Sequence, residues 1–139
     1  MKFNDSIPVF GDVSFRGKCP KEDIEQINFV SWLKHHHPEL RCLFIHPKNE
    51  GKRSHNQVNY ESRTGGLPTG ASDLIIPGKP CFVVELKRQD HTKSNWQKGQ
   101  QEYLLSAKET GCFIGIALGF EGAKEAFNLW LGIITENQK

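Results

Sequence analysis

The stretch "GASDLIIPGKPCFVVELKRQ", residues 70–89, contains two short apolar runs separated by a turn signal. Residues 72–76 and 82–87 have the composition of strands, and the "PGKP" between them favours a turn. The pattern predicts a β-hairpin. Its charges are unusual, because Asp73 opens the first run while Glu85 and Lys87 lie inside the second, where strands are normally apolar.

Strand geometry brings these three charges together. Because alternate residues of a strand point to the same side, Glu85 and Lys87 share one face of the second run. With the turn spanning residues 77–81, Asp73 opposes Glu85. Facing residues of an antiparallel pair lie roughly 5 Å apart. The sequence therefore predicts two carboxylates and one ammonium at the open end of the hairpin.

This charge cluster suggests a specific chemistry. Two carboxylates at such a distance repel each other unless a cation or a proton lies between them. Mg²⁺ or Mn²⁺, held by one or two carboxylates, waters and phosphate oxygens, is the natural partner and can activate water against a phosphodiester. Lys87 would position or deprotonate that water, or stabilise the developing charge. The alternative is a Glu85–Lys87 ion pair on a solvated sheet face.

Size and composition limit the classes of protein to consider. We expect 139 residues to form a single domain, with an N-terminal arm at 1–20 and the core at 21–133. No apolar run reaches the ~20 residues of a membrane helix, and no signal peptide is recognisable, so a cytoplasmic protein is expected. The four cysteines lack metal-site spacing and are expected to be reduced, with Cys42, Cys81 and Cys112 buried.

The charge distribution favours a phosphate-bearing partner. Although the net charge is +2, residues 41–100 carry ten of the 18 Lys and Arg residues and five of the 16 Asp and Glu residues. The polar segment 47–70 is long for a loop in a compact domain, and such loops are often functional. An alternative is a loop that contacts nothing in particular. Its candidate phosphate contacts are Asn49, Lys52, Arg53 and Arg63.

The remaining periodicities predict an α/β protein with the element order α-β-β-β-α-β-α. Helices are expected at 22–37, 94–110 and 121–131, and further strands at 42–46 and 112–118, with a short strand near 13–15 in the arm. In the first helix, the expected buried stripe is Ile24, Ile27, Val30 and Leu33, widened by Phe29 and Trp32, and Pro38 ends the helix. Ser94 is the expected N-cap and Gly111 the expected C′ residue of the second helix.

Several motifs, in order, resemble one known family. Asp73 followed by Glu85-Leu86-Lys87 is similar to the D…(D/E)-x-K signature of restriction-endonuclease-like nucleases. The VRR-NUC branch also shows a Glu and a Gln before Trp-Leu, a His-Pro-x-Asn-x-Gly-x-Arg-like stretch, and a Gln eleven residues before a Gly. Here these are Glu22, Gln26, Trp32-Leu33, "HPKNEGKR", Gln100 and Gly111. The resemblance covers about residues 20–131.

The resemblance implies a restriction-endonuclease-like core, with a central mixed four-stranded sheet flanked by helices. It implies that Asp73 and Glu85 bind the metal, that the Leu86 carbonyl adds a ligand, and that Lys87 serves the nucleophilic water. It also places Gln100 near the site, where it would hold water or phosphate.

The resemblance leaves the roles of two positions open. Glu22 fits the spacing of a helix glutamate that completes the metal shell, and Glu25, one turn on, is the alternative. Ser72 stands where the family usually has a proline that helps to aim the catalytic Asp.

The implied activity is that of a metal-dependent, structure-selective DNA endonuclease. The chain is similar to stand-alone viral or bacterial members, which implies a homodimeric Holliday junction resolvase, phage-encoded and active in a bacterial host cell. The alternatives are a flap or branched-DNA repair or replication nuclease, a catalytically inactive DNA-binding module, and a non-enzymatic interaction protein. Phe127 and Trp130, near the apolar end "LWLGII", could form a dimer interface or simply core.

Overall fold

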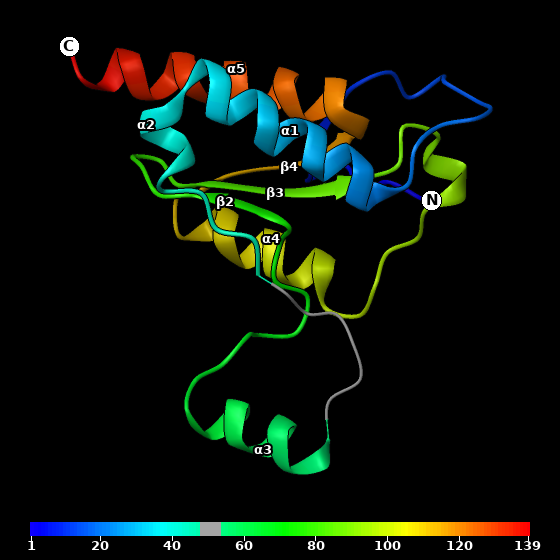
Figure 1. Cartoon of the computed structure of the whole chain (residues 1–139), viewed down its shortest axis with the longest axis vertical. Coiled ribbons are helices and arrows are strands. Elements are labelled where there is room, and N and C mark those ends of the chain that lie inside the picture. Colours follow the sequence, from blue (N-terminus) through cyan, green and yellow to red (C-terminus); the bar gives the residue numbers. More distant parts are fainter. Residues whose placement is uncertain (48–53) are drawn as a thin grey trace.

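The computed structural model describes residues 1–47 and 54–139 and has a four-stranded mixed sheet at its centre (Figure 1). The strand order is β1-β4-β3-β2. Strand β3 runs parallel to β4 and antiparallel to β2, and β1 runs parallel to β4. The predicted α/β architecture is confirmed. The strands are β1 (Val9–Phe10), β2 (Leu74–Ile76), β3 (Phe82–Lys87) and β4 (Phe113–Leu118).

Helices cover both faces of this sheet. Helices α1 (Glu22–His36) and α5 (Gly119–Asn137) lie on one face, and α4 (Gln100–Glu109) lies on the other (Figure 1). A short α2 (Pro38–Arg41) follows α1, and a 3₁₀ turn, η1 (His91–Lys93), follows β3. Figure 1 shows α3 (His55–Arg63) standing apart from the sheet.

The alternation along β3 divides its side chains between two cores. Phe82, Val84 and Leu86 belong to the large core beneath α1 and α5. Val83 belongs to the smaller core with Leu104 of α4. The residues that continue the Val83 face are Glu85 and Lys87, so the charged pair points to the α4 side of the sheet, where polar partners are available.

The predicted hairpin register is confirmed. Ile76 pairs with Phe82 and Leu74 with Val84. Continuing this register by one residue places Asp73, just before β2, opposite Glu85. Strand β3 has the bounds that its sequence predicts, because alternation and the adjacent turn are both local signals.

Two predicted strands are wrong. Residues 13–15 form a turn, because the Asp12 carboxylate accepts hydrogen bonds from the backbone N–H and the hydroxyl of Ser14, at 2.9 and 2.6 Å. The strand of the arm is instead β1, which pairs with β4. The strand expected at 42–46 is reduced to a single bridge between Ile45 and Ile75.

Helix α1 buries only part of the predicted stripe. Its core residues are Phe29 and Leu33, both 0% exposed, together with the buried Glu25. Ile24 and Ile27 are 46% and 61% exposed. Because the charged Glu25 lies on the buried face, a search for hydrophobic periodicity does not recognise that face in full.

Other differences concern helix bounds and burial. Helix α4 begins at Gln100 rather than at Ser94, because the Ser94 hydroxyl accepts a hydrogen bond from the Arg88 backbone N–H at 3.1 Å instead of capping a helix. Gly111 follows α4 with φ +96°, as its predicted C′ role requires. Helix α3 lies inside the predicted loop, and α5 continues past 131 to Asn137. The expected burial of the cysteines is wrong for Cys42, which is exposed, while Cys81 and Cys112 are only partly buried.

Candidate active site

A pocket of about 570 Å³ opens at the end of the hairpin, beside the last residues of β3. Separate elements supply its polar wall: the residue before β2, the end of β3, the segment after η1, and the first residues of α1 and α4. All five side chains that the sequence assigns to catalysis line this one pocket. They are Glu22, Asp73, Glu85, Lys87 and Gln100.

Hydrogen bonds hold Asp73 from two sides. Its Oδ2 accepts from the Leu86 backbone N–H at 3.1 Å, and its backbone carbonyl accepts from Nδ1 of His46 at 2.9 Å. The Leu86 backbone thus already contacts Asp73, and the Leu86 carbonyl stays a predicted metal ligand. Ser72, where the resembling family has proline, is fully buried, and its hydroxyl has no partner among the described residues.

A chain of hydrogen bonds links Glu85, Gln100 and Lys87. Nε2 of Gln100 donates to Oε1 of Glu85 at 3.0 Å, and Oε1 of Gln100 accepts from Nζ of Lys87 at 2.9 Å. The Gln97 backbone N–H also donates to Oε1 of Gln100, at 2.8 Å, which fixes the orientation of the amide. Nζ of Lys87 donates further to the Asn95 carbonyl at 2.8 Å. Within the described chain two of its three N–H groups therefore have acceptors, and the third remains available for water or phosphate.

Glu85 is the under-satisfied member of this cluster. It is 1% exposed, and its Oε2 is buried with no hydrogen-bond donor among the residues that the structure describes. Burial, and next the neighbouring Asp73 carboxyl, raise the pKa of Glu85 well above its ordinary range, and the Lys87 ammonium opposes this only in part. A cation beside Oε2 would satisfy the oxygen and stabilise the charged carboxylate.

The donor set fits a hard divalent cation. Mg²⁺ uses one or two carboxylates and completes its shell with waters and substrate phosphate oxygens. Asp73 and Glu85 offer these carboxylates. No group of three or more His, Cys, Asp or Glu side chains within residues 1–47 and 54–139 is arranged to hold a metal ion by itself. The pocket therefore suits an ion that keeps several waters, rather than a closed structural site.

The two candidate glutamates of α1 have different surroundings. Glu22 lines the pocket, where burial raises its pKa against the effect of Lys87, and the Ser94 hydroxyl donates to its Oε1 at a long 3.4 Å. Glu25 points to α5 instead, and its Oε2 accepts from the Phe120 backbone N–H at 2.6 Å. Of the two alternatives, Glu22 is thus the one placed to act at the pocket, and Glu25 caps the start of α5.

The predicted DNA contacts are only partly described. Arg63, at the end of α3, is exposed and does not line the pocket. Asn49, Lys52 and Arg53 lie outside the described residues.

Sequence reasoning missed four residues around the pocket. Lys93 and Lys98 stand on its wall, where phosphate oxygens would pass. His46 supports Asp73, and Ser94 bridges Glu22 to the Arg88 backbone. The only signal for the two lysines was the basic excess of residues 41–100, which does not single out individual side chains.

The part of the chain that the structure describes contains no helix long and apolar enough to span a bilayer. The expected dimer interface at the C-terminal end is not available at two of its residues. Phe127 and Trp130 are both 0% exposed and belong to the large core, so the core alternative is confirmed for them.

Comparison with known proteins establishes the fold. No protein-family model matches the sequence, and no curated protein does. Among solved structures, a chain described as a VRR_NUC domain protein is similar, with a TM-score of 0.65 and 19% sequence identity, covering 83% of this chain and 91% of the other. The chain therefore has a VRR-NUC type of fold, as its motifs predict. A fold does not by itself define a reaction, which has to be argued from the site.

Proposed function

We propose that this protein is a Mg²⁺- or Mn²⁺-dependent endonuclease that hydrolyses phosphodiester bonds in branched DNA. The observation that carries the proposal is the buried Glu85 carboxylate. One of its oxygens has no donor among the described residues, and it lies beside Asp73 and the buried Lys87. Two carboxylates with an ammonium in an open pocket suit a hard cation together with the phosphate that it would bind.

The proposal gives each residue a distinct role. Asp73 and Glu85 hold the ion, which when bound polarises the phosphoryl group and lowers the pKa of a water. Lys87 directs its remaining N–H to that water or to the charge that develops on phosphate. Gln100 keeps Glu85 and Lys87 in register through its two hydrogen bonds. Glu22 stands across the pocket, where it can bind a water of the ion's shell.

The finer proposal is that the DNA is a four-way junction and that the enzyme is a homodimer. A C₂ dimer presents two equivalent sites, which suits symmetric incision of such a junction. The finer proposal rests on the likeness of the motifs to those of stand-alone viral or bacterial nucleases. Such an enzyme would act in the cytoplasm of a bacterial host. A flap or other branched repair intermediate is the alternative substrate. The dimer interface would involve a face other than the core residues Phe127 and Trp130.

Cleavage assays test this proposal directly. Purified protein with Mg²⁺ or Mn²⁺ is incubated with labelled four-way junction, flap, nicked and linear duplex DNA. We expect cleavage of a branched substrate that disappears in Lys87→Ala and persists in Lys79→Ala, whose lysine lies exposed in the hairpin turn. Symmetric cuts across the junction and a dimer in sedimentation analysis would support the finer proposal. An absence of cleavage on every substrate would contradict the enzyme.

A metal titration tests the site without using activity. The melting temperature of the wild-type protein should rise with added Mg²⁺ or Mn²⁺, because an ion that binds only the native state stabilises it, by about 2.7 kcal/mol at a hundred times its Kd. Glu85→Gln should lose most of this rise. A rise that is equal in both proteins would place the ion elsewhere.

A further inference from the structure

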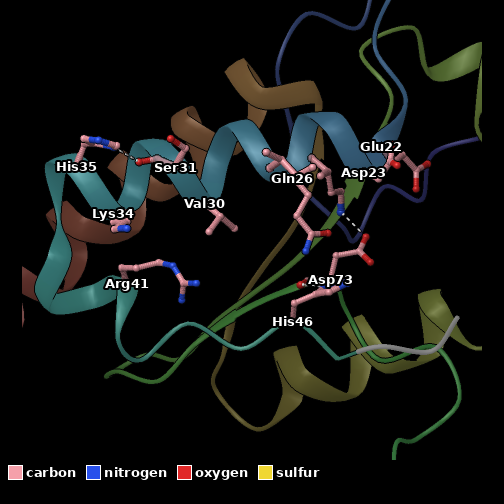
Figure 2. A pocket seen from close by; sticks show the side chains of 12 residues that line it. Glu22, Asp23, Gln26, Val30, Ser31, Lys34, His35, Arg41, His46 and Asp73 are labelled. Atoms are coloured by element: carbon pink, nitrogen blue, oxygen red, sulfur yellow. Dashed lines mark hydrogen bonds between the residues drawn. The ribbon is translucent and has the colours of Figure 1, made fainter.

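A second groove of about 730 Å³ continues from the candidate active site. It shares Glu22 and Asp73 with that pocket, so the two cavities meet at the carboxylates. One wall is the length of α1, and the other is formed by Asp73, His46 and Arg41 (Figure 2). The two cavities are therefore adjacent, so a ligand bound in the first could extend into the second.

The middle of this groove contains an apolar strip, flanked by the polar Gln26 and Ser31. Ile27 and Val30 line it from α1. Ile27 is 61% exposed, because α1 turns Phe29 and Leu33 to the core instead. Figure 2 shows Val30 projecting from α1 into the space between the helix and the chain that carries Arg41. A large exposed apolar side chain inside a groove provides a contact surface for a partly apolar ligand.

The two ends of the groove carry opposite charges. At the near end stand Glu22 and Asp73, where the proposed cation would bind. At the far end are Lys34 and Arg41, and neither has an acidic side chain paired with it among the described residues. The Arg41 guanidinium lies 5.8 Å from the centre of the Phe44 ring. The far end thus suits direct binding of an anion. The near end, which is acidic, would bind an anion only with a metal ion between them.

The dimensions select among nucleic-acid partners. Lys34 lies twelve residues after Glu22 on α1, a distance of about 18 Å along the helix at 1.5 Å per residue. A volume of about 730 Å³ is in the usual range of pockets for small organic ligands. That volume suits a few nucleotides of one strand, whereas a duplex, with a major groove alone about 12 Å wide, is too large.

We propose that this groove binds an unpaired DNA strand that continues from the scissile phosphate. Its bases lie against Ile27 and Val30, and a phosphate farther along the strand binds Lys34 and Arg41. Because Nδ1 of His46 already donates to the Asp73 carbonyl, Nε2 is the ring nitrogen that remains for the strand. The inference rests on the proposed function for the placement of the scissile phosphate. Among the branched substrates, it favours the alternative, a flap or other branched DNA with a single-stranded arm, over a fully paired four-way junction.

A binding experiment tests the groove separately from catalysis. Fluorescein-labelled pentathymidylate is titrated with full-length protein in EDTA, and fluorescence anisotropy is measured. We expect Lys34→Ala/Arg41→Ala to weaken binding at least tenfold and to reduce the slope of log affinity against log salt by about 1.4, since two phosphate contacts are lost at roughly 0.7 each. Ile27→Ser should weaken binding severalfold with little change in the salt slope.

The matched control removes the same number of positive charges from another part of the surface. Lys79→Ala/Lys139→Ala also removes two exposed lysines, from the hairpin turn and the C-terminus, and should bind pentathymidylate like wild type. Equal losses in both double variants would reduce the effect to net charge and overturn the proposal. It would also be overturned if a duplex of equal total charge competed as well as the single strand.

Cleavage distinguishes failure of the groove from failure of the enzyme. With active protein, Lys34→Ala/Arg41→Ala should lose its preference for DNA with an unpaired arm over the fully paired equivalent. If branched DNA is cut but the variant changes neither binding nor preference, the groove proposal is wrong and the proposed function stands. If no DNA is cut but pentathymidylate binding still depends on Lys34 and Arg41, the groove stands and the nuclease activity is wrong.

Discussion

Buried carboxylates in two regions of this molecule have opposite environments. The first region joins α1, the start of α5 and the N-terminal arm. There Glu25 accepts a hydrogen bond from the Phe120 backbone N–H at 2.6 Å, and Asp90 accepts from the Gly17 and Thr92 backbone N–H groups at 3.0 and 3.1 Å. At the hairpin end, Glu85 has one donor at 3.0 Å, and its other oxygen has none among the described residues. The first pair is satisfied within the fold, whereas the second oxygen of Glu85 is left for a proton or a bound cation.

The direction of the pKa shifts follows the same division. Hydrogen bonds from the Thr92 side chain, and next from the Gly17 backbone, lower the pKa of Asp90 to about 2. Burial and the Asp73 carboxyl raise the pKa of Glu85 well above its ordinary range. Burial of an acid is therefore a poor marker of function in this chain. An acid that is buried and lacks donors is the better marker.

The largest expected effect is on cleavage activity, which should fall strongly in Glu85→Gln and remain in Glu25→Gln. Glu85→Gln should reduce single-turnover cleavage of the preferred branched DNA by about 10²–10⁴-fold, the usual range for loss of a group that moves or holds reacting atoms. Glu25→Gln keeps an acceptor for the Phe120 N–H and should cleave within a few-fold of wild type. Similar losses of cleavage in both variants would show that a missing hydrogen-bond donor does not distinguish a functional buried acid from a structural one.

The next largest effect is on stability, where the structural Glu25 should matter more than the pocket residue Glu22. Glu25→Ala leaves the Phe120 N–H without its charged acceptor, which should lower the free energy of unfolding by about 1–3 kcal/mol. Glu22→Ala, one turn earlier on the same helix, should change it by less than about 0.5 kcal/mol. Urea denaturation monitored by circular dichroism measures both. A larger loss in Glu22→Ala would reassign the structural role to the pocket residue.

These two glutamates also show the limit of sequence reasoning here. Residues three apart lie on the same side of a helix, so spacing alone left Glu22 and Glu25 as alternatives. The difference arises from the start of α5, about 95 residues later in the chain, where the Phe120 N–H needs an acceptor. The hairpin, in contrast, was predictable in register and in the bounds of β3, because its turn and its alternation are local.

The other errors have the same physical origin. The buried stripe of α1 was predicted too wide, because its buried line runs through the charged Glu25 to Phe29 and Leu33, which leaves Ile24 and Ile27 exposed. The start of α4 was misplaced because the Ser94 hydroxyl binds the Arg88 backbone rather than a helix end. Strand β1 has two residues and is defined by its parallel pairing with β4, which no local pattern reveals. Tertiary contacts decided each case.

A third effect, of a few degrees, should distinguish Glu85 by its pH dependence in metal-free protein. Its pKa in the folded state is raised above the ordinary value of 4.5, so its contribution to stability is fully present below pH 4.5 and is lost as the pH rises through the folded-state pKa. Glu85→Gln removes that loss. We expect the variant to melt above wild type at pH 8 in EDTA and to approach it near pH 4. Added Mg²⁺ should narrow the difference at pH 8 by stabilising the wild type alone.

The smallest effect concerns Asp90, whose linkage has the opposite sign. Its folded-state pKa is about 2 against an ordinary 3.8, so its stabilisation is present above pH 3.8 and is lost as the pH falls towards 2. Asp90→Asn should therefore melt slightly below wild type at pH 6, and the two should converge near pH 2. Melting curves by circular dichroism from pH 2 to pH 8, in EDTA, measure this. Because Asp90 anchors Gly17 and lies outside the pocket, cleavage at neutral pH should change little. A variant that instead melted above wild type, by a margin that grew with rising pH, would behave like Glu85→Gln, and the contrast between satisfied and unsatisfied acids would no longer hold.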